Sequence, residues 1–335
     1  MLYLIQKEAI KKHPSGIPLY QKAWEANRKH PSGIPLCPDS MGNKEEIKKG
    51  ETIMWDGILL SGFADEIDMD LGKQIEVLKK LDIHHVEMRG VNGKGLVEYS
   101  INEAKEIKKQ LDEAGIRLSS VGSPIGKIKI TDDFAPHLEL YKHTVEIAHL
   151  MDVPYIRMFS FFMPENENYA PYRGKVMDQL GQFADYAKAS QAVLLHENEK
   201  DIYGDVADRC LEIMKEFYGD HFKAVFDFAN FVQCKQDTLA AYEMLKPYIA
   251  YIHVKDALWS DASVVPAGMG DGHVEEILKM LKNCGYKGFL SLEPHLSDFA
   301  GFSALEQNAA EKKKLSGEEA FTMAYESLKK ILKSI

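Results

Sequence analysis

The chain has 335 residues, of which 45% are hydrophobic, and it carries a formal net charge of −10 at pH 7. No apolar stretch reaches the roughly 20 residues that a membrane-spanning helix needs, and the opening Met1–Ile5 is too short for the apolar region of a signal peptide. The negative charge argues against a nucleic-acid partner, because phosphate binding needs a positive field. We therefore expect a cytoplasmic protein whose partners include neither membrane nor nucleic acid.

Residues 1–55 differ in composition from the rest and are rich in Lys, Pro and Gly. Within them, the segment Lys12–Leu19 (KHPSGIPL) recurs unchanged as Lys29–Leu36, and a short helix is expected between the two copies. Two copies are too few for a solenoid, which needs about three or more repeats. We interpret residues 1–55 as a surface extension of a catalytic domain at 56–335. The alternative is a clasp on that domain or on a neighbouring subunit.

From Gly57 onward, short apolar runs alternate with amphipathic stretches, a pattern that predicts parallel strands joined by crossover helices. The predicted strands are Gly57–Phe63, His84–Met88, Arg117–Val121, Tyr155–Phe159, Val193–Glu197, Ala224–Asp227, Tyr251–Val254 and Phe289–Glu293. The predicted helices include Leu71–Lys80, Asn102–Ala114, Leu138–Met151, Val176–Ser190, Val206–Phe217, Thr238–Leu245 and Val274–Cys284. This α/β pattern fits a (β/α)₈ TIM barrel with an N-terminal extension, and no GxGxxG motif follows the first strand to indicate a dinucleotide site.

Four of the predicted strands end in residues that bind hard metal ions. These residues are Glu197, Asp227, His253 and Glu293. The carboxyl ends of parallel strands meet at one end of a barrel, where ligand sites form. Two Glu, one Asp and a single His make an oxygen-rich set suited to Mn²⁺, Mg²⁺, Co²⁺ or Zn²⁺. This pattern is the basis for predicting an enzyme.

The alternation of side chains along a strand sorts the neighbours of these residues. His196 should point away from the barrel mouth, toward the helix layer. From there it could orient Glu197, or it could be an ordinary buried histidine of the core. Lys255 shares a face with His253 and is a candidate substrate-binding residue. It could stabilise an oxyanion or bind an acidic substrate group; the alternative is a structural salt bridge with Asp256, a residue behind the site, or with another acid at the rim.

Further candidates lie at other strand ends. His295 could donate a proton to a leaving group, or be an ordinary loop histidine. Arg89, with Glu87, could bind sugar hydroxyls or form an internal ion pair. Lys127 could contact the substrate from a loop, or be solvated there. The segment Gly268–Gly272 resembles a phosphate cradle but lacks the Walker lysine, and it fits a turn over the pocket equally well.

The strand-end motifs resemble those of the xylose-isomerase-like TIM-barrel superfamily, most closely its sugar phosphate isomerase/epimerase branch, with ketose 3-epimerases and inosose dehydratases as relatives. The matching segments are Leu195–Glu199 (LHENE), Phe226–Asn230 (FDFAN), Tyr251–Asp256 (YIHVKD) and Leu290–His295 (LSLEPH), supported by Gly62–Ile67, Val86–Arg89 and Val265–Gly272. The resemblance covers about Gly57 to Pro294. It implies one divalent metal ion, with Mn²⁺ as the first candidate, held by Glu197, Asp227, His253 and Glu293.

Two positions depart from the pattern of ketose 3-epimerases. Those enzymes carry a His where this chain has Asn230, and an Arg where it has Trp259. Both positions contact substrate in the ketose 3-epimerases, so Asn230 and Trp259 are candidate substrate-binding residues, and the departure argues against a free ketose as substrate. Trp259 could stack on a sugar or an aromatic aglycone; packing of a long loop is the alternative.

The chemistry that these residues favour is proton transfer at the carbon next to a carbonyl. The enediolate formed needs its negative charge stabilised, and a divalent ion that chelates the carbonyl and the adjacent hydroxyl does so. Glu197 and Glu293 would flank the sugar as base and acid, as in the epimerases that the chain resembles. The first hypothesis is therefore a metal-dependent isomerase or epimerase of a keto sugar or related polyol.

Other functions stay open, because one barrel supports several outcomes. The closest alternative is a lyase of the inosose dehydratase type, or one that cleaves 3-oxo-glycosides, including C-glycosides, with His295 or His196 assisting the leaving group. An endonuclease-IV-like enzyme is contradicted by the acidic charge and by the shortage of additional His ligands. A non-catalytic binding protein is a fourth class. A homo-oligomer or a partner subunit is compatible with each of them.

Overall fold

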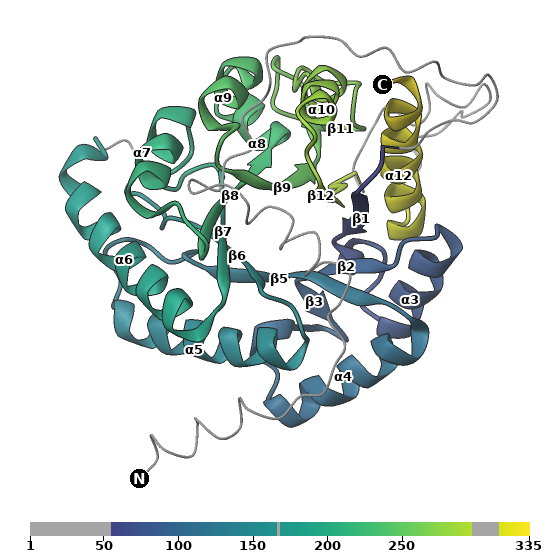
Figure 1. Cartoon of the computed structure of the whole chain (residues 1–335), viewed down its shortest axis with the longest axis horizontal. Coiled ribbons are helices and arrows are strands. Elements are labelled where there is room, and N and C mark those ends of the chain that lie inside the picture. Colours follow the sequence, from purple (N-terminus) through teal and green to yellow (C-terminus); the bar gives the residue numbers. More distant parts are fainter. Residues whose placement is uncertain (1–54, 166–167, 297–314) are drawn as a thin grey trace. The chain divides into compact units, whose positions relative to one another are not determined.

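A computed structural model describes residues 55–165, 168–296 and 315–335. The duplicated N-terminal segment lies outside these ranges, so the domain boundary near residue 55 stays a prediction. Eight strands form one parallel sheet in the order β1-β12-β9-β8-β7-β6-β5-β2. Figure 1 shows these strands as a nearly closed ring with helices around it, and this arrangement confirms the predicted TIM barrel.

Each strand of the barrel coincides with a predicted one. The strands are β1 (Ile58–Gly62), β2 (His85–Met88), β5 (Arg117–Ile125), β6 (Tyr155–Met158), β7 (Val193–Glu197), β8 (Phe222–Asp227), β9 (Ile249–Val254) and β12 (Gly288–Leu292). Their register sets His253 beside Asp227 on one neighbouring strand and beside Ser291 on the other. The carboxyl ends of β8, β9 and β12 are thereby brought level.

Helices cover the outside of the barrel, and two small hairpins extend its loops. The long helices are α3 (Leu71–Lys80), α4 (Ile101–Ala114), α5 (Phe134–Leu150), α6 (Arg173–Ser190), α7 (Ala207–Phe217), α9 (Thr238–Leu245), α10 (Val274–Asn283) and α12 (Gly317–Ser334). The short elements are α8 (Phe228–Gln233), the 3₁₀ helices η2 (Ala64–Glu66), η3 (Leu96–Glu98) and η4 (Ala170–Tyr172), and the hairpins β3 (Gly90–Val91) with β4 (Lys94–Gly95) and β10 (Asp256–Ala257) with β11 (Val264–Val265). None of the helices in the described part of the chain is long and apolar enough to cross a bilayer.

Local sequence fixes where the helices begin and end. Helix α4 begins with a capping box between Ser100 and Glu103, and it ends at Gly115, whose φ of 74° lies in the left-handed region. A second capping box, between Ser316 and Glu319, begins α12. These signals satisfy backbone groups that the first and last turns leave without helical partners.

The inside of the barrel is packed with side chains rather than open. Leu195, Val225, Tyr251 and Phe289 form a buried apolar cluster there. Beside it, the Ser119 hydroxyl lies 2.8 Å from the Tyr251 hydroxyl and 2.6 Å from that of Ser61. A ligand site in such a barrel therefore lies at its mouth, where the loops after the strands converge.

Replacing Phe321 by Ala should destabilise the barrel strongly. Phe321 of α12 is fully buried, and its ring packs so closely on β1 that a Cβ atom at Gly62 would lie 2.7 Å from it. We expect the free energy of unfolding to fall by about 3–5 kcal/mol, measured by urea denaturation. Met269→Ala, at a side chain that is 49% exposed, should change it by less than about 0.5 kcal/mol. Similar losses in both variants would contradict this packing.

Acidification should destabilise the fold partly through His85. Its ring packs edge-on against Phe289 with centroids 5.2 Å apart, and burial lowers its pKa from 6.5 to about 4. Between these values the unfolded chain binds a proton that the folded chain does not, so stability falls as the pH is lowered from 6.5 to about 4. His85→Gln should flatten this part of the stability curve, and His149→Gln, at an exposed position, should not. Equal slopes in wild type and His85→Gln would contradict the assignment.

Candidate active site

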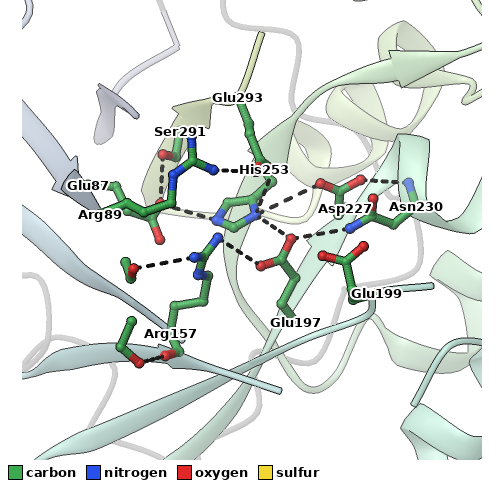
Figure 2. A network of polar contacts seen from close by, with 12 residues as sticks. Glu87, Arg89, Arg157, Glu197, Glu199, Asp227, Asn230, His253, Ser291 and Glu293 are labelled. Carbon is green, nitrogen blue, oxygen red and sulfur yellow. Dashed lines mark hydrogen bonds and ion pairs between the residues drawn. The ribbon is translucent and has the colours of Figure 1, made fainter. Parts of the chain in front are cut away.

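The four predicted metal ligands come together at the carboxyl ends of their strands. Glu197 ends β7, Asp227 ends β8, His253 lies near the end of β9 and Glu293 follows β12. One donor atom from each lies within 4.8 Å of the others, and all four residues are buried. Figure 2 shows their side chains converging, with the imidazole of His253 in the middle.

The imidazole of His253 has two different sides. Its Nδ1 faces the carboxylates, at 3.0 Å from Glu197 Oε1, 3.6 Å from Glu293 Oε2 and 3.8 Å from Asp227 Oδ2. Its Nε2 lies 3.1 Å from Glu87 Oε2, which also accepts a hydrogen bond of 2.8 Å from Ser291 Oγ. A metal-binding histidine typically uses one nitrogen for the ion and the other for a carboxylate. The ring of His253 is oriented in this way.

Asp227 presents one oxygen to the cluster because its other oxygen caps a helix. Oδ1 accepts a hydrogen bond of 2.8 Å from the backbone N–H of Asn230 at the start of α8. Oδ2 is buried without a hydrogen bond and lies 3.2 Å from Nζ of Lys255. Burial raises the pKa of Asp227 to about 7, although the attraction of Lys255 opposes it. The negative charges of Glu293 and Glu197 act in the same direction as burial.

Glu197 is held as a carboxylate by groups on both of its oxygens. Oε1 accepts a hydrogen bond of 3.2 Å from Asn230 Nδ2 and lies beside His253, whereas Oε2 is 3.3 Å from Nη1 of Arg157. Burial by itself would raise the pKa of Glu197, but His253 and Arg157 outweigh burial and lower it to about 2. Arg157, on β6, is a site residue that sequence reasoning missed, although a charged residue inside the apolar run Tyr155–Phe159 was a usable signal.

Glu293 connects the cluster to the solvent-facing side of the site. Its Oε2 accepts a hydrogen bond of 2.9 Å from Lys255, and its Oε1 lies 3.4 Å from both Arg89 Nη1 and His295 Nε2. Burial would raise the pKa of Glu293, but Lys255 and His253 hold it below its ordinary value. Glu66 lies 3.3 Å from both Arg89 and His295. Arg89, Lys255 and His295 thus lie where the sequence suggested, around Glu293.

Lys127 pairs with an acid outside the four-residue cluster. It forms an ion pair of 2.9 Å with Glu199, which lies beside Glu197 in Figure 2. Its Nζ also lies 4.2 Å from the ring centroid of Phe159, and the guanidinium of Arg157 lies 4.9 Å from the same ring. Lys127 and Glu199 are each partly exposed, so they can contact a ligand at the mouth.

Asp256 organises a loop instead of pairing with Lys255. Its carboxylate accepts hydrogen bonds from the backbone N–H groups of Ala257, Gly268, Gly270 and Gly272, at 2.9 to 3.0 Å. The glycine segment that resembles a phosphate cradle is therefore closed around a carboxylate of the chain itself. Lys255 pairs with Asp227 and Glu293 and not with Asp256, so the salt bridge considered as the alternative role of Lys255 is made with other acids of the site.

Trp259 and His196 lie outside the cluster. Trp259 is 42% exposed, its backbone N–H donates to Asp271, and the Lys235 ammonium lies over its ring. His196 is buried and stacks on Phe222 at 6.4 Å, on the side of the sheet that faces the helices, as its parity predicts. In the described part of the chain, Nε2 of His196 is buried without a hydrogen bond, and the roles predicted for Trp259 and His196 stay predictions.

The donor set fits a divalent metal ion. Three carboxylates and one imidazole nitrogen converge on one volume, one of the carboxylate oxygens has no hydrogen bond, and the imidazole is held from behind. Hard oxygen ligands with a single nitrogen are suited to Mn²⁺, Mg²⁺, Co²⁺ or Zn²⁺. The residues that would hold it are Glu197, Asp227, His253 and Glu293.

An eight-stranded barrel with acidic and histidine side chains at the carboxyl ends of its strands places the chain in the class of TIM-barrel proteins with a site at the barrel mouth. The chain belongs to the xylose isomerase-like TIM barrel family, whose model matches residues 75–332. The family assignment from the strand-end motifs is thereby confirmed. The comparison with curated proteins found no match.

Similar solved structures include enzymes of more than one reaction type. A probable 3-DHS dehydratase, AsbF, from Bacillus anthracis is 14% identical with a TM-score of 0.62, and the match covers 81% of this chain and 98% of that one. A D-tagatose 3-epimerase-like protein is 17% identical with a TM-score of 0.61, covering 82% and 98%. A xylose isomerase-like TIM barrel protein from Mycobacterium smegmatis in complex with magnesium is 15% identical with a TM-score of 0.58, covering 83% and 97%. At these identities the likeness shows the fold alone.

Proposed function

We propose that the protein is a divalent-metal-dependent isomerase or epimerase that moves a proton next to the carbonyl of a keto sugar or related polyol. The observation that carries the proposal is the convergence of Glu197, Asp227, His253 and Glu293 within 4.8 Å at the carboxyl ends of four strands. Mn²⁺ is the first candidate for the ion, and the magnesium in a similar structure supports a divalent metal in this fold. When bound, the ion supplies Lewis-acid stabilisation of negative charge on the oxygens of the substrate.

Glu197 and Glu293 are the proposed proton-transfer groups. They come from β7 and from the end of β12, which are separated in the sheet by β8 and β9, and both carboxylates lie near His253 Nδ1. His253 and Arg157 keep Glu197 ionised in the resting site, so its carboxylate is free to accept a proton. Such positioned acids and bases contribute roughly 10²- to 10⁴-fold to a rate.

His295 provides the proposed proton exchange with solvent. Its side chain is 43% exposed, and Nε2 lies 3.4 Å from Glu293 Oε1 and 3.3 Å from Glu66 Oε1. The backbone N–H of His295 also donates to Glu66 Oε2 at 2.6 Å, which holds the residue next to Glu293. A proton taken up at Glu293 Oε1 can pass to the ring of His295 and from there to water.

The test is hydrogen exchange at carbon. The protein is incubated in heavy water with Mn²⁺ and a panel of keto sugars, inososes and 3-oxo-glycosides, and the products are followed by NMR. Deuterium uptake with an intact carbon skeleton supports the isomerase or epimerase. The absence of exchange with every compound would contradict the proposal and favour a binding protein.

A lyase is the second candidate, because the partly exposed imidazole of His295 lies beside Glu293 and can pass on a proton that Glu293 has taken up. Once a proton has been removed next to the carbonyl, a group on the β carbon can leave, and His295 can protonate it. Dehydration of an inosose and cleavage of a 3-oxo-glycoside or C-glycoside both belong to this chemistry. The same experiment distinguishes it, since an enone or a released aglycone would appear in place of an isomer.

A further inference from the structure

We infer that the substrate is an uncharged polyhydroxy ketone and that the site discriminates against phosphate esters and carboxylates. The inference rests on the proposed function, because it names the substrate class of the same site. Three properties of the site carry it: the pairing of its cations, the excess of its carboxylates, and the closure of the loop that would otherwise bind an anion.

Within residues 55–165, 168–296 and 315–335, four Lys and Arg side chains lie around the site, and each is already paired with a carboxylate. The pairs are Arg89 with Asp65 (2.8 Å), Arg157 with Glu197 (3.3 Å), Lys255 with Glu293 (2.9 Å) and Lys127 with Glu199 (2.9 Å). Two of these cations pair with further acids as well, since Arg89 also contacts Glu66 and Lys255 also contacts Asp227. An anionic substrate group would have to displace an internal carboxylate from each cation that it used.

Carboxylates outnumber these cations. The acids within the network are Asp65, Glu66, Glu87, Glu197, Glu199, Asp227 and Glu293. A single divalent ion among the four proposed ligands offsets part of this excess and is itself shared by three carboxylates. Like charges that are brought together in a partly buried site cost several kcal/mol, so a phosphate or carboxylate group is opposed wherever it enters.

The loop that resembles an anion cradle holds an anion of its own. The amides of Gly268, Gly270 and Gly272 donate to the buried Asp256 carboxylate at 2.9 to 3.0 Å. The loop closes so tightly that a Cβ atom at Gly270 would lie 2.4 Å from Asp256 Oδ1. These N–H groups are therefore not available to a phosphate, and the chain lacks at this loop the backbone donors that phosphate sites use.

Paired acids and bases at the mouth suit hydroxyl groups instead. A hydroxyl both donates and accepts hydrogen bonds, so it needs a carboxylate and a cation side by side. Lys127 and Glu199 offer this combination with side chains that are 33% and 24% exposed, and Arg89 with Asp65 offers it at 32% and 13%. A neutral polyol can add to these pairs without breaking them.

The test compares each neutral compound with its charged partner. The Mn²⁺-loaded protein is given D-fructose and D-tagatose, their 6-phosphates, a 3-oxo-glucoside and its 6-phosphate, and deuterium uptake is measured by NMR. For each neutral compound that exchanges, we expect a rate constant kcat/KM about 100-fold lower with its phosphate ester. A phosphate ester that reacts as fast as its free sugar, or faster, overturns the inference.

A binding measurement keeps the inference separate from the proposed function. Calorimetry with inorganic phosphate and a sugar phosphate should show no binding to wild type at millimolar concentration. Glu199→Gln, which releases Lys127, should raise the affinity for the sugar phosphate about tenfold. Glu146→Gln, which removes the same charge at an exposed site, should leave that affinity unchanged. If no compound exchanges, the proposed function fails. Independently of that result, the inference is overturned if phosphate binds to wild type or if Glu199→Gln does not gain affinity for the sugar phosphate.

Discussion

Replacing Glu197 or Glu293 by Gln is expected to lower turnover to background, a loss of roughly 10²- to 10⁴-fold. Glutamine keeps the size of the side chain but cannot accept and return a proton at the reacting carbon. It also removes one of the charges that surround His253. The measurement is the rate of deuterium uptake or of product formation with the best substrate of the panel, at saturating Mn²⁺.

Two controls separate chemistry from folding in these variants. Thermal unfolding shows whether each variant folds, and Glu146→Gln removes the same charge from an exposed position on α5. We expect the Glu146 variant to keep wild-type turnover. Full activity in either Glu197→Gln or Glu293→Gln would reject a mechanism that uses two carboxylates.

Replacing Glu87 by Gln is expected to weaken metal binding by about 10- to 100-fold, although Glu87 is not one of the proposed ligands. The Glu87 carboxylate accepts from His253 Nε2 and so leaves Nδ1 free to face the cluster. An amide accepts more weakly, and its NH₂ group would favour the opposite tautomer, which puts the proton on Nδ1. Mn²⁺ affinity can be measured by electron paramagnetic resonance without any substrate.

Ser291→Ala tests the orientation of the His253 ring with a smaller expected effect. Ser291 donates to Glu87 Oε2, so its loss should weaken Mn²⁺ binding less than Glu87→Gln does. His253→Ala, which removes the imidazole altogether, should weaken it most. An affinity for Mn²⁺ in Glu87→Gln equal to that of wild type would show that Glu87 does not orient the ligand.

The fold could be predicted because the barrel depends on local patterns. Buried apolar runs define each strand, and amphipathic stretches with caps such as Ser100 and Gly115 define the helices. The four-residue cluster followed from the same rule, because residues at the carboxyl ends of parallel strands must converge. Helix α12 was not predicted, although its capping box at Ser316 and Glu319 is present in the sequence.

Contacts across the barrel could not be predicted, because they depend on register and on which side chains meet. Glu87 on β2 reaches His253 on β9 through the barrel interior, and nothing in either segment alone indicates that pairing. The same holds for Lys255, for which the sequence left Asp256 and other rim acids open as salt-bridge partners. In the structure the backbone N–H groups of the glycine loop bind Asp256, which leaves Lys255 to Asp227 and Glu293.

The most direct test is a crystal structure of the protein soaked with Mn²⁺, with data collected to locate the ion by its anomalous scattering. The account predicts one strong peak at about 2.0–2.4 Å from one donor atom each of Glu197, Asp227, His253 and Glu293. A peak bound to other residues, or no peak at these four side chains, would contradict it.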